Sequence, residues 1–95
     1  MTSIDRFKNK NESFAKKILS KEEYLEWIIS EKKDIFLATR WAIKEAIFKS
    51  DNNFSNFNNI NLKKVNQKYC FQEFQISTSR EKNYIIAIAL KKKDV

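Results

Sequence analysis

A glutamate and a lysine one helical turn apart are the residues whose types and spacing best suit chemistry in this chain. Glu45 and Lys49 are four positions apart, and at about 100° per residue the helix positions nearest Glu45 are mostly apolar. Burying an ionised carboxylate is costly unless it pairs with a cation or binds a metal. Two interpretations stay open. One is an ordinary ion pair on a solvated helix edge; the other is a magnesium or phosphate site, with Glu45 as oxygen ligand and Lys49 facing phosphate.

The composition excludes several other kinds of active site. The chain has no histidine and one cysteine, so it has neither a Ser-His or Cys-His pair nor an internal disulfide. It also has no glycine and no proline, which excludes the glycine-rich loops that bind phosphate. We expect asparagine to take the backbone positions with positive φ, and asparagine clusters in residues 52–59. Any chemistry must therefore use carboxylates, lysines or a bound cation.

Length and charge predict one small domain with an acidic partner. Ninety-five residues, of which 42% are hydrophobic, suffice for a single hydrophobic core. No apolar run is long enough for a membrane span or a signal peptide, which predicts a cytoplasmic protein with no membrane partner. The formal net charge of +7 favours nucleic acid, a phosphorylated small molecule or an acidic protein as the partner.

Three helices are expected to position the Glu–Lys pair. The spacing of apolar residues predicts helices over residues 11–19, 21–29 and 34–49, and the last of these carries the pair. Ser20, followed three residues later by Glu23, is the pattern of a capping box and predicts the start of the second helix.

Strands are expected after the asparagine-rich loop. Apolar residues alternate from Ile60 and Leu62 through residue 78, which predicts strand faces. Residues 83–90 are apolar on both alternations, as in a strand that is covered on both faces, and residues 79–82 suit a hairpin connection before it. We therefore expect an α+β fold with helices packed on an antiparallel sheet.

Five segments of the chain form a pattern that extends over most of its length. They are RWAIKEAIFK at 40–49, IDRF at 4–7, SFAKKILSKEE at 13–23, ISTS at 76–79 and YIIA at 84–87. In their order along the chain they resemble the signatures of the 4'-phosphopantetheinyl transferase superfamily, in particular its small holo-[acyl-carrier-protein] synthase class.

The resemblance implies an enzyme and its site residues. Members of the class are α+β homotrimers with active sites between subunits, and they transfer the phosphopantetheine arm of coenzyme A to a serine of apo acyl carrier protein. By resemblance Glu45 binds Mg²⁺, Lys49 contacts the pyrophosphate, and these two residues carry the catalysis. The resemblance also implies that four residues bind coenzyme A, namely Arg40, Lys49, Ser77 and Arg80.

The resemblance also assigns the basic N-terminal part of the chain to the carrier protein. Arg6, Phe14 and Lys17 would dock this acidic partner; the alternative is that Phe14 belongs to the core and the lysines form a solvated face. The metal-binding aspartate of the family lies before the position that matches Ile4. We therefore expect residues 1–95 to form a single transferase domain whose first strand is truncated.

Two alternatives to an active transferase stay open. The first is a basic module that binds nucleic acid without catalysis. Against it, the lysines are scattered along the chain with no recognition helix or aromatic stacking platform, so we expect no nucleic-acid partner. The second is a homologue that binds the carrier protein but has lost activity, because the second metal carboxylate of the family has no counterpart in the chain.

Overall fold

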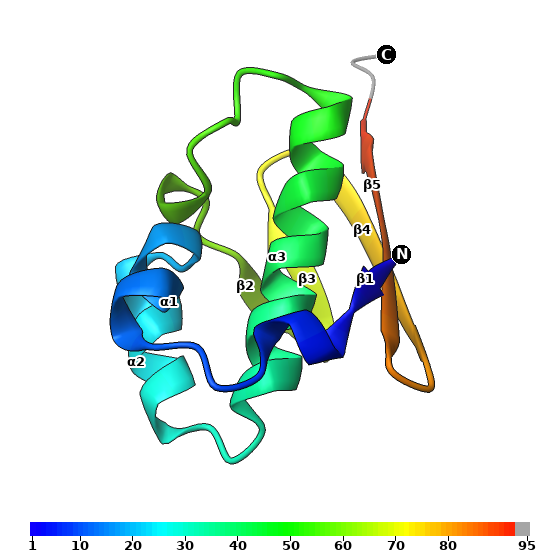
Figure 1. The fold of residues 1–95 in the computed structure, drawn as a ribbon. Helices are drawn as coiled ribbons and strands as arrows, with labels where there is room; N and C mark the ends of the chain where they lie inside the picture. Colours follow the sequence, from blue (N-terminus) through cyan, green and yellow to red (C-terminus); the bar gives the residue numbers. More distant parts are fainter. Residues whose placement is uncertain (93–95) are drawn as a thin grey trace.

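A long central helix lies between two short helices and an antiparallel sheet (Figure 1). The computed structural model describes residues 1–92. Its helices are α1 (Glu12–Ile18), α2 (Lys21–Ile29) and the central α3 (Lys33–Ser50). Two 3-10 turns complete the helical part, η1 (Ile4–Phe7) before α1 and η2 (Phe57–Asn59) after α3.

Polar side chains determine where the first two helices begin. At α1 the Phe14 N–H donates to Asn11 Oδ1 at 2.9 Å. At α2 the predicted capping box is present, with Ser20 N–H donating to Glu23 Oε1 at 2.8 Å and Glu23 N–H donating to Ser20 Oγ at 3.3 Å. The three predicted helices are confirmed, each within one residue at either end. Within the described residues, no helix is both long and apolar enough to cross a membrane.

The five strands form one sheet in the order β1-β5-β4-β3-β2, with antiparallel neighbours throughout. Their bounds are β1 (Thr2–Ser3), β2 (Lys63–Val65), β3 (Lys68–Phe71), β4 (Phe74–Glu81) and β5 (Tyr84–Lys91). The predicted hairpin is present, because β4 and β5 pair along their full length. Its connection is shorter than the predicted 79–82, since residues 79–81 extend β4 and the chain turns at residues 82–83. The α+β prediction is therefore correct.

Both sides of α3 are buried. On one side Leu37, Ala38 and Ala42 join the core that α1, α2 and η1 complete. On the other side Ile43 and Ile47 pack with Phe74 of β4 and with residues of the loop before β2. Ile60 and Leu62 belong to that loop and not to a strand, so the sequence prediction was wrong there. They alternate because this irregular segment fills the space beside α3, where they are 1% and 3% exposed.

The positions of positive φ also differ from the prediction. They are Asn9, Asn66, Gln67, Gln72 and Lys82, and none of them lies in residues 52–59. The physical reason is that two-residue hairpin turns require left-handed backbone, whereas a long loop does not. Asn66 and Gln67 form such a turn between β2 and β3.

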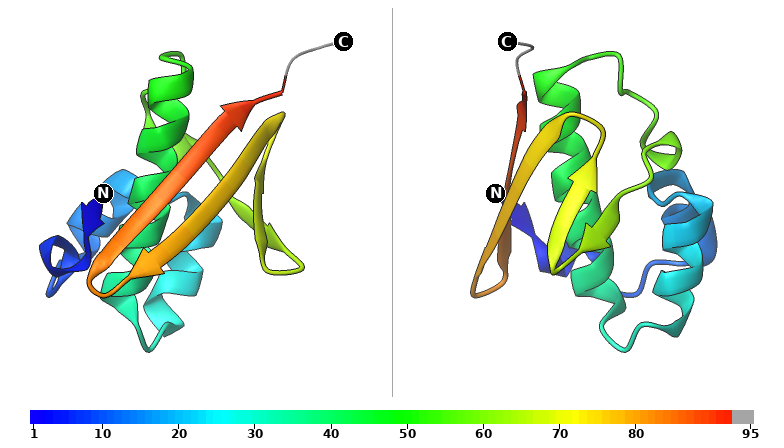
Figure 2. Two further views of the ribbon diagram at one scale, coloured as in Figure 1. Left: turned by 90° about the vertical axis from the view of Figure 1, so that its right-hand side faces the viewer. Right: turned by 180° about the vertical axis from the view of Figure 1, so that it is seen from behind.

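The outward face of β5 is uncovered in the single chain. Ile85 points under α3 and is 3% exposed, whereas Ile86, Ile88 and Leu90 on the opposite face are 37%, 53% and 61% exposed. The left view of Figure 2 shows β4 and β5 in front of α3, with no other described element over them. The prediction that both faces of this strand are covered is therefore not met within one chain.

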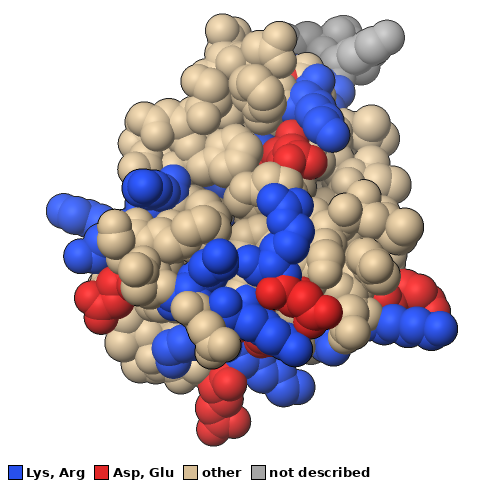
Figure 3. All heavy atoms as spheres, viewed as in Figure 1, with Lys and Arg blue, Asp and Glu red and all other residues tan. Residues whose placement is uncertain are grey.

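Basic side chains gather on one side of the molecule. Figure 3 shows most of the visible lysine and arginine atoms over α1, η1 and the adjoining part of α3. Arg6, Lys8, Lys10 and Lys17 are all exposed. This side therefore provides a positive surface beside the central helix.

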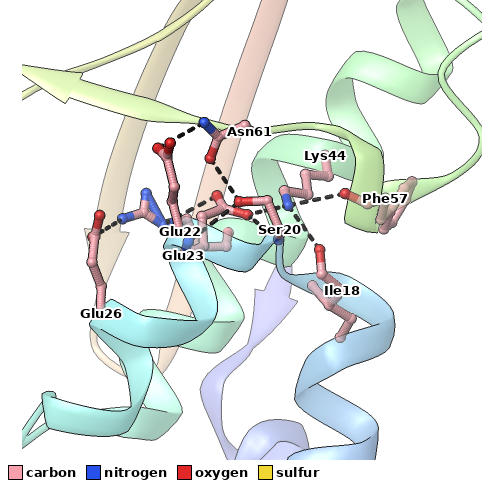
Figure 4. Close-up of polar contacts among 9 residues, drawn as sticks. Ile18, Ser20, Glu22, Glu23, Glu26, Lys44, Phe57 and Asn61 are labelled. Atoms are coloured by element: carbon pink, nitrogen blue, oxygen red, sulfur yellow. Dashed lines mark hydrogen bonds and ion pairs between the residues drawn. The ribbon is translucent and has the colours of Figure 1, made fainter.

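A buried lysine joins the elements around α3. Lys44 Nζ donates to the backbone oxygens of Ile18 at 2.7 Å and Phe57 at 3.0 Å, and it pairs with Glu23 (Figure 4). The side chains of Lys44 and Glu23 are both 0% exposed. Burial lowers the pKa of Lys44 from its ordinary value, and the Glu23 carboxylate opposes this shift. The end of α1, the start of α2 and η2 are thus held to one point on α3.

Glu23 also faces a second cation. Arg40 Nε lies 3.6 Å from Glu23 Oε2, which is an ion pair but too long for a hydrogen bond, and Arg40 Nη2 donates to Glu26 Oε2 at 3.2 Å. Beside them Ser20 Oγ donates to Asn61 Oδ1 at 2.6 Å. One carboxylate therefore compensates two buried positive charges, and loss of either cation leaves it the other.

Because one carboxylate serves two cations, its loss should destabilise the fold more than the loss of either cation. Glu23→Gln leaves Lys44 and Arg40 without their shared carboxylate and should lower the free energy of unfolding by about 3–5 kcal/mol. Lys44→Met should cost less, because Glu23 keeps Arg40 as a partner. Urea unfolding monitored by circular dichroism measures both variants.

The neighbouring Glu22→Gln is the matched control, since Glu22 is exposed. It should change stability by no more than about 0.5 kcal/mol. Equal losses for the two glutamate variants would show that the buried pair does not hold the elements together.

Candidate active site

Three side chains on successive turns of α3 lie on one side of the helix: Trp41, Glu45 and Lys49. The side chains of Glu45 and Lys49 are 35% and 73% exposed, and Glu45 Oε1 lies 3.4 Å from Lys49 Nζ. The predicted i,i+4 pairing is therefore present. An ion pair on the surface adds little to the free energy of unfolding. Because solvent reaches both side chains, both charges are also accessible to a ligand.

Glu45 fits a hard cation as a single protein ligand. Within residues 1–92 no group of three or more aspartate, glutamate, cysteine or histidine side chains is arranged to hold a metal. Asp5, an acidic residue in the first segment of the sequence pattern, pairs with Lys8 at 3.1 Å and does not join Glu45. Mg²⁺ commonly takes one or two protein carboxylates and completes its shell with water and substrate phosphate. The donor set therefore fits a magnesium ion that a phosphate ligand completes.

An aromatic pocket opens beside the same stripe of α3. Arg6, Phe14 and Trp41 are among the residues that line it, and its volume is about 520 Å³. The Phe7 ring lies 6.2 Å from that of Phe14 and 5.8 Å from that of Trp41, and the Arg6 guanidinium lies 5.2 Å from the Trp41 ring. Trp41 precedes Glu45 by one turn, which is about 6 Å along the helix axis. The pocket therefore adjoins the Glu–Lys pair.

Lys17 lies on this same face. It lines a smaller adjoining pocket together with Phe14 and Lys10, and Lys10 Nζ lies 5.0 Å from the Phe14 ring. Phe14 is half-buried, so it packs on the core and also lines both pockets. The fold thus brings together the three residues that the sequence pattern assigned to a protein partner.

Ser77 and Arg80 face opposite sides of the sheet. They are three residues apart on β4, and side chains alternate along a strand. Arg80 pairs with the buried Ile85 on the helix side, whereas Ser77 pairs with the exposed Ile88 on the outward side. Arg80 and Lys64 line a cleft of about 300 Å³ that runs between α3 and the sheet. A ligand in this cleft meets Arg80 but not Ser77 of the same chain.

Arg40 is buried away from the Glu–Lys pair. Its side chain is 4% exposed, and its guanidinium lies over the rings of Phe36 at 4.5 Å and Tyr69 at 4.8 Å. Its Nη1 has no hydrogen-bond partner in the described chain. The contact with coenzyme A that the sequence pattern implied for Arg40 stays a prediction.

Lys44 is the residue near the site that sequence reasoning did not single out. A signal was present, because Lys44 falls on the same side of a helix as Leu37, seven positions earlier, and Ile47, three positions later. A lysine between core positions of a helix indicates a buried cation that needs an acidic partner. The sequence does not show that this partner is Glu23 on another helix.

Comparison with known proteins identifies the family. The model of the "4'-phosphopantetheinyl transferase superfamily" matches residues 1–89. The holo-[acyl-carrier-protein] synthase of Mycoplasma mobile is 60% identical over 92 residues, which cover 97% of this chain and 84% of that protein. The corresponding protein of Mycoplasmopsis pulmonis is 48% identical over 91 residues, covering 96% and 84%.

A solved structure shows the same fold. It is the holo-[acyl-carrier-protein] synthase of Neisseria meningitidis, which superposes with a TM-score of 0.82 at 24% sequence identity and covers 97% of this chain and 93% of that one. From the family match and the two relatives, we conclude that the chain belongs to the 4'-phosphopantetheinyl transferase superfamily.

Proposed function

We propose that this chain is a holo-[acyl-carrier-protein] synthase, which transfers the 4'-phosphopantetheine group of coenzyme A to a serine of apo acyl carrier protein. One observation carries the proposal: a single stripe of α3 forms part of the basic aromatic pocket through Trp41, and it presents the partly exposed Glu45 one turn later and the exposed Lys49 two turns later. A protein partner docked in the pocket would therefore present its serine beside two groups suited to phosphate chemistry. The family match does not favour the nucleic-acid-binding and inactive alternatives.

The reaction needs charge neutralisation more than covalent help. The serine oxygen forms a bond to the β-phosphorus of coenzyme A, and the P–O bond between this phosphorus and the bridging oxygen of the pyrophosphate breaks. The hydroxyl proton passes to water, and adenosine 3',5'-bisphosphate leaves. In the proposal Lys49 contacts the pyrophosphate and offsets its charge. Glu45 holds Mg²⁺, which when bound supplies further charge neutralisation at the phosphates.

The nucleotide end of coenzyme A is assigned to the cleft that Arg80 and Lys64 line. Hydroxyl groups of Thr39 and Thr78 also line it, and none of its described lining residues is acidic. This donor set suits phosphate oxygens. Ser77, on the outward face of the sheet, can contribute to coenzyme A binding only where another copy of the chain meets that face.

The carrier protein is assigned to the face that Arg6, Phe14 and Lys17 form. Phe14 offers a half-buried apolar surface, and the exposed Arg6 and Lys17 flank it with positive charge. An acidic protein with an apolar contact of its own complements this face in charge and in chemistry.

The active assembly is proposed to be a homotrimer in the cytoplasm. The uncovered aliphatic face of β5 supports contacts between copies, because a contiguous apolar surface on so small a domain is stabilised when another chain buries it. Contacts through this face also bring Ser77 of one chain toward its neighbour.

The first test concerns Glu45. Glu45→Gln keeps the side-chain volume but removes the charge that a hard cation requires, so turnover should fall at least on the order of 100-fold with little change in thermal stability. The measurement is the mass gain of apo carrier protein incubated with coenzyme A and Mg²⁺. Glu31→Gln, at an exposed position, is the control and should retain activity. Undiminished turnover of the Glu45 variant would assign this residue a structural role only.

The second test concerns docking. Arg6→Glu should weaken binding of the carrier protein by about tenfold at low salt and reduce its salt dependence, while the affinity for coenzyme A stays unchanged. Titration calorimetry at two salt concentrations measures both ligands. Lys63→Glu, at an exposed position on β2 and so at the opposite edge of the sheet from β1 and η1, is the control and should leave the affinity for the carrier protein unchanged. Equal losses for the carrier protein and coenzyme A would refute the assignment of this face.

The third test concerns assembly. Ile88→Arg places a charge in the middle of the uncovered β5 face and should convert trimers into monomers in sedimentation experiments. Val65→Arg, at an exposed apolar position on β2, is the matched control and should sediment as the unaltered protein does. A monomeric unaltered protein, or a trimeric Ile88→Arg variant, would contradict the proposed interface.

A further inference from the structure

Helix α2 is apolar on its outward side as well as on its buried side. Glu23 and Trp27 point inward, whereas Leu25, Ile28 and Ile29 on the other side are 65%, 42% and 81% exposed. These three aliphatic side chains are three or four positions apart or adjacent, so they form one patch along the helix. The patch takes no part in the proposed transfer.

At its Leu25 end the patch opens into a pocket between α1, α2 and η2. The pocket has a volume of about 920 Å³, larger than the 520 Å³ of the aromatic pocket at Arg6. Leu19, Tyr24 and Leu25 supply its apolar lining, and Lys16 and Lys21 also line it. We call this pocket together with the outward patch of α2 the α2 groove.

The walls of the pocket are joined by the buried polar contacts described above. Lys44 Nζ bonds the backbone oxygens of Ile18 and Phe57, which end α1 and begin η2 (Figure 4). The hydrogen bond from Ser20 Oγ to Asn61 Oδ1 ties the start of α2 to the loop after η2. The pocket is therefore formed before any ligand arrives, which is typical of small-molecule sites.

The charged residues that line the pocket are lysines, although the Glu12 carboxylate lies near the Tyr24 phenol. The ammonium of Lys16 lies 5.1 Å from the Tyr24 ring, which places it on the pocket wall. Burial, and then the nearby Glu12 carboxylate, raise the pKa of Tyr24, so its phenol stays neutral. A ligand head between Lys16 and Lys21 is therefore favoured if it is an anion.

The combination of an anion site and an aliphatic strip selects the occupant. A small polar anion would leave the strip uncovered, and a polyanion would need positive charge along its whole length. From Lys21 to Ile29 the helix rises about 12 Å, which is room for an extended alkyl chain that starts at the lysines. An acidic protein helix is the competing occupant, but the basic aromatic face at Arg6 already provides the surface that suits such a partner.

We propose that the α2 groove binds a single-chain amphiphile with an anionic head, of the fatty-acid class. The head lies between Lys16 and Lys21, and the chain lies on Leu25 and toward Ile28 and Ile29. This site is separate from the proposed transfer site, and only the preference for an amphiphile over an acidic helix rests on the proposed function.

Calorimetric titration with octanoate, decanoate and dodecanoate below their micelle concentrations tests the proposal on the unaltered protein. Binding should be saturable with one equivalent per chain. Each added pair of methylenes should tighten it by about fourfold, as expected for half-burial of the chain. Decyltrimethylammonium, which has a chain of decanoate length but the opposite charge, should bind at least tenfold more weakly.

Two variants locate the site. Leu25→Gln and Lys21→Gln should each weaken decanoate binding by at least fivefold, whereas Val65→Gln and Lys82→Gln, matched exchanges at exposed positions elsewhere, should not. All four positions are exposed, so circular dichroism should show unchanged folds.

Three results would overturn the proposal. One is equal affinity for decanoate and its cationic counterpart. Another is an unchanged affinity for decanoate in the Leu25→Gln variant. The third is displacement of Leu25-dependent binding by the acidic carrier protein or by self-association, which would make the groove a protein interface.

Discussion

One carboxylate, Glu23, faces two cations in the interior of a protein that has little room for uncompensated charge. Its side chain is wholly buried, as is that of Lys44, and Arg40 is nearly so. A charge in such surroundings is tolerable only with a partner and with hydrogen bonds for its remaining groups. The ammonium of Lys44 finds these at the end of α1 and in η2 as well as in Glu23, so satisfying it positions three separate segments on α3. These contacts connect the layer of short helices in Figure 1 to the central helix.

Helix α3, which Lys44 joins to the neighbouring elements, also carries the exposed side chains of the site. Lys44 and Glu45 are consecutive, so about 100° of helical rotation separates a buried structural charge from an accessible one. The residues of α3 that pack on both layers leave the chemistry-bearing side little freedom to turn. A site on such a rigid element is placed more accurately than one on a loop. The aromatic pocket gains from this too, because Trp41 belongs to α3 while Arg6 and Phe14 come from elements packed against it.

A chain of this length does not bury all the apolar surface that its sequence contains. Two aliphatic surfaces remain outside the core, the outward face of β5 and the outward side of α2. They differ in their surroundings. The face of β5 lies on the open side of the sheet, beside the polar side chains of β4, which suits another protein surface. The side of α2 is narrow and leads into a pocket that lysines also line, which suits a small ligand.

The sequence by itself determined the local structure and the i,i+4 placement of Glu45 and Lys49. Helix periodicity and a capping box act between neighbours in the chain, so the three helices and the start at Ser20 were predictable. The resemblance of the motif at residues 40–49 pointed to the family that the comparisons show. Contacts between distant segments were a different matter. Packing brings Lys44 to Glu23 and buries Arg40 against two aromatic rings. Strand register places Ser77 and Arg80 on opposite sides of the sheet. Only the tertiary structure decides these, because each depends on where a second segment lies in space.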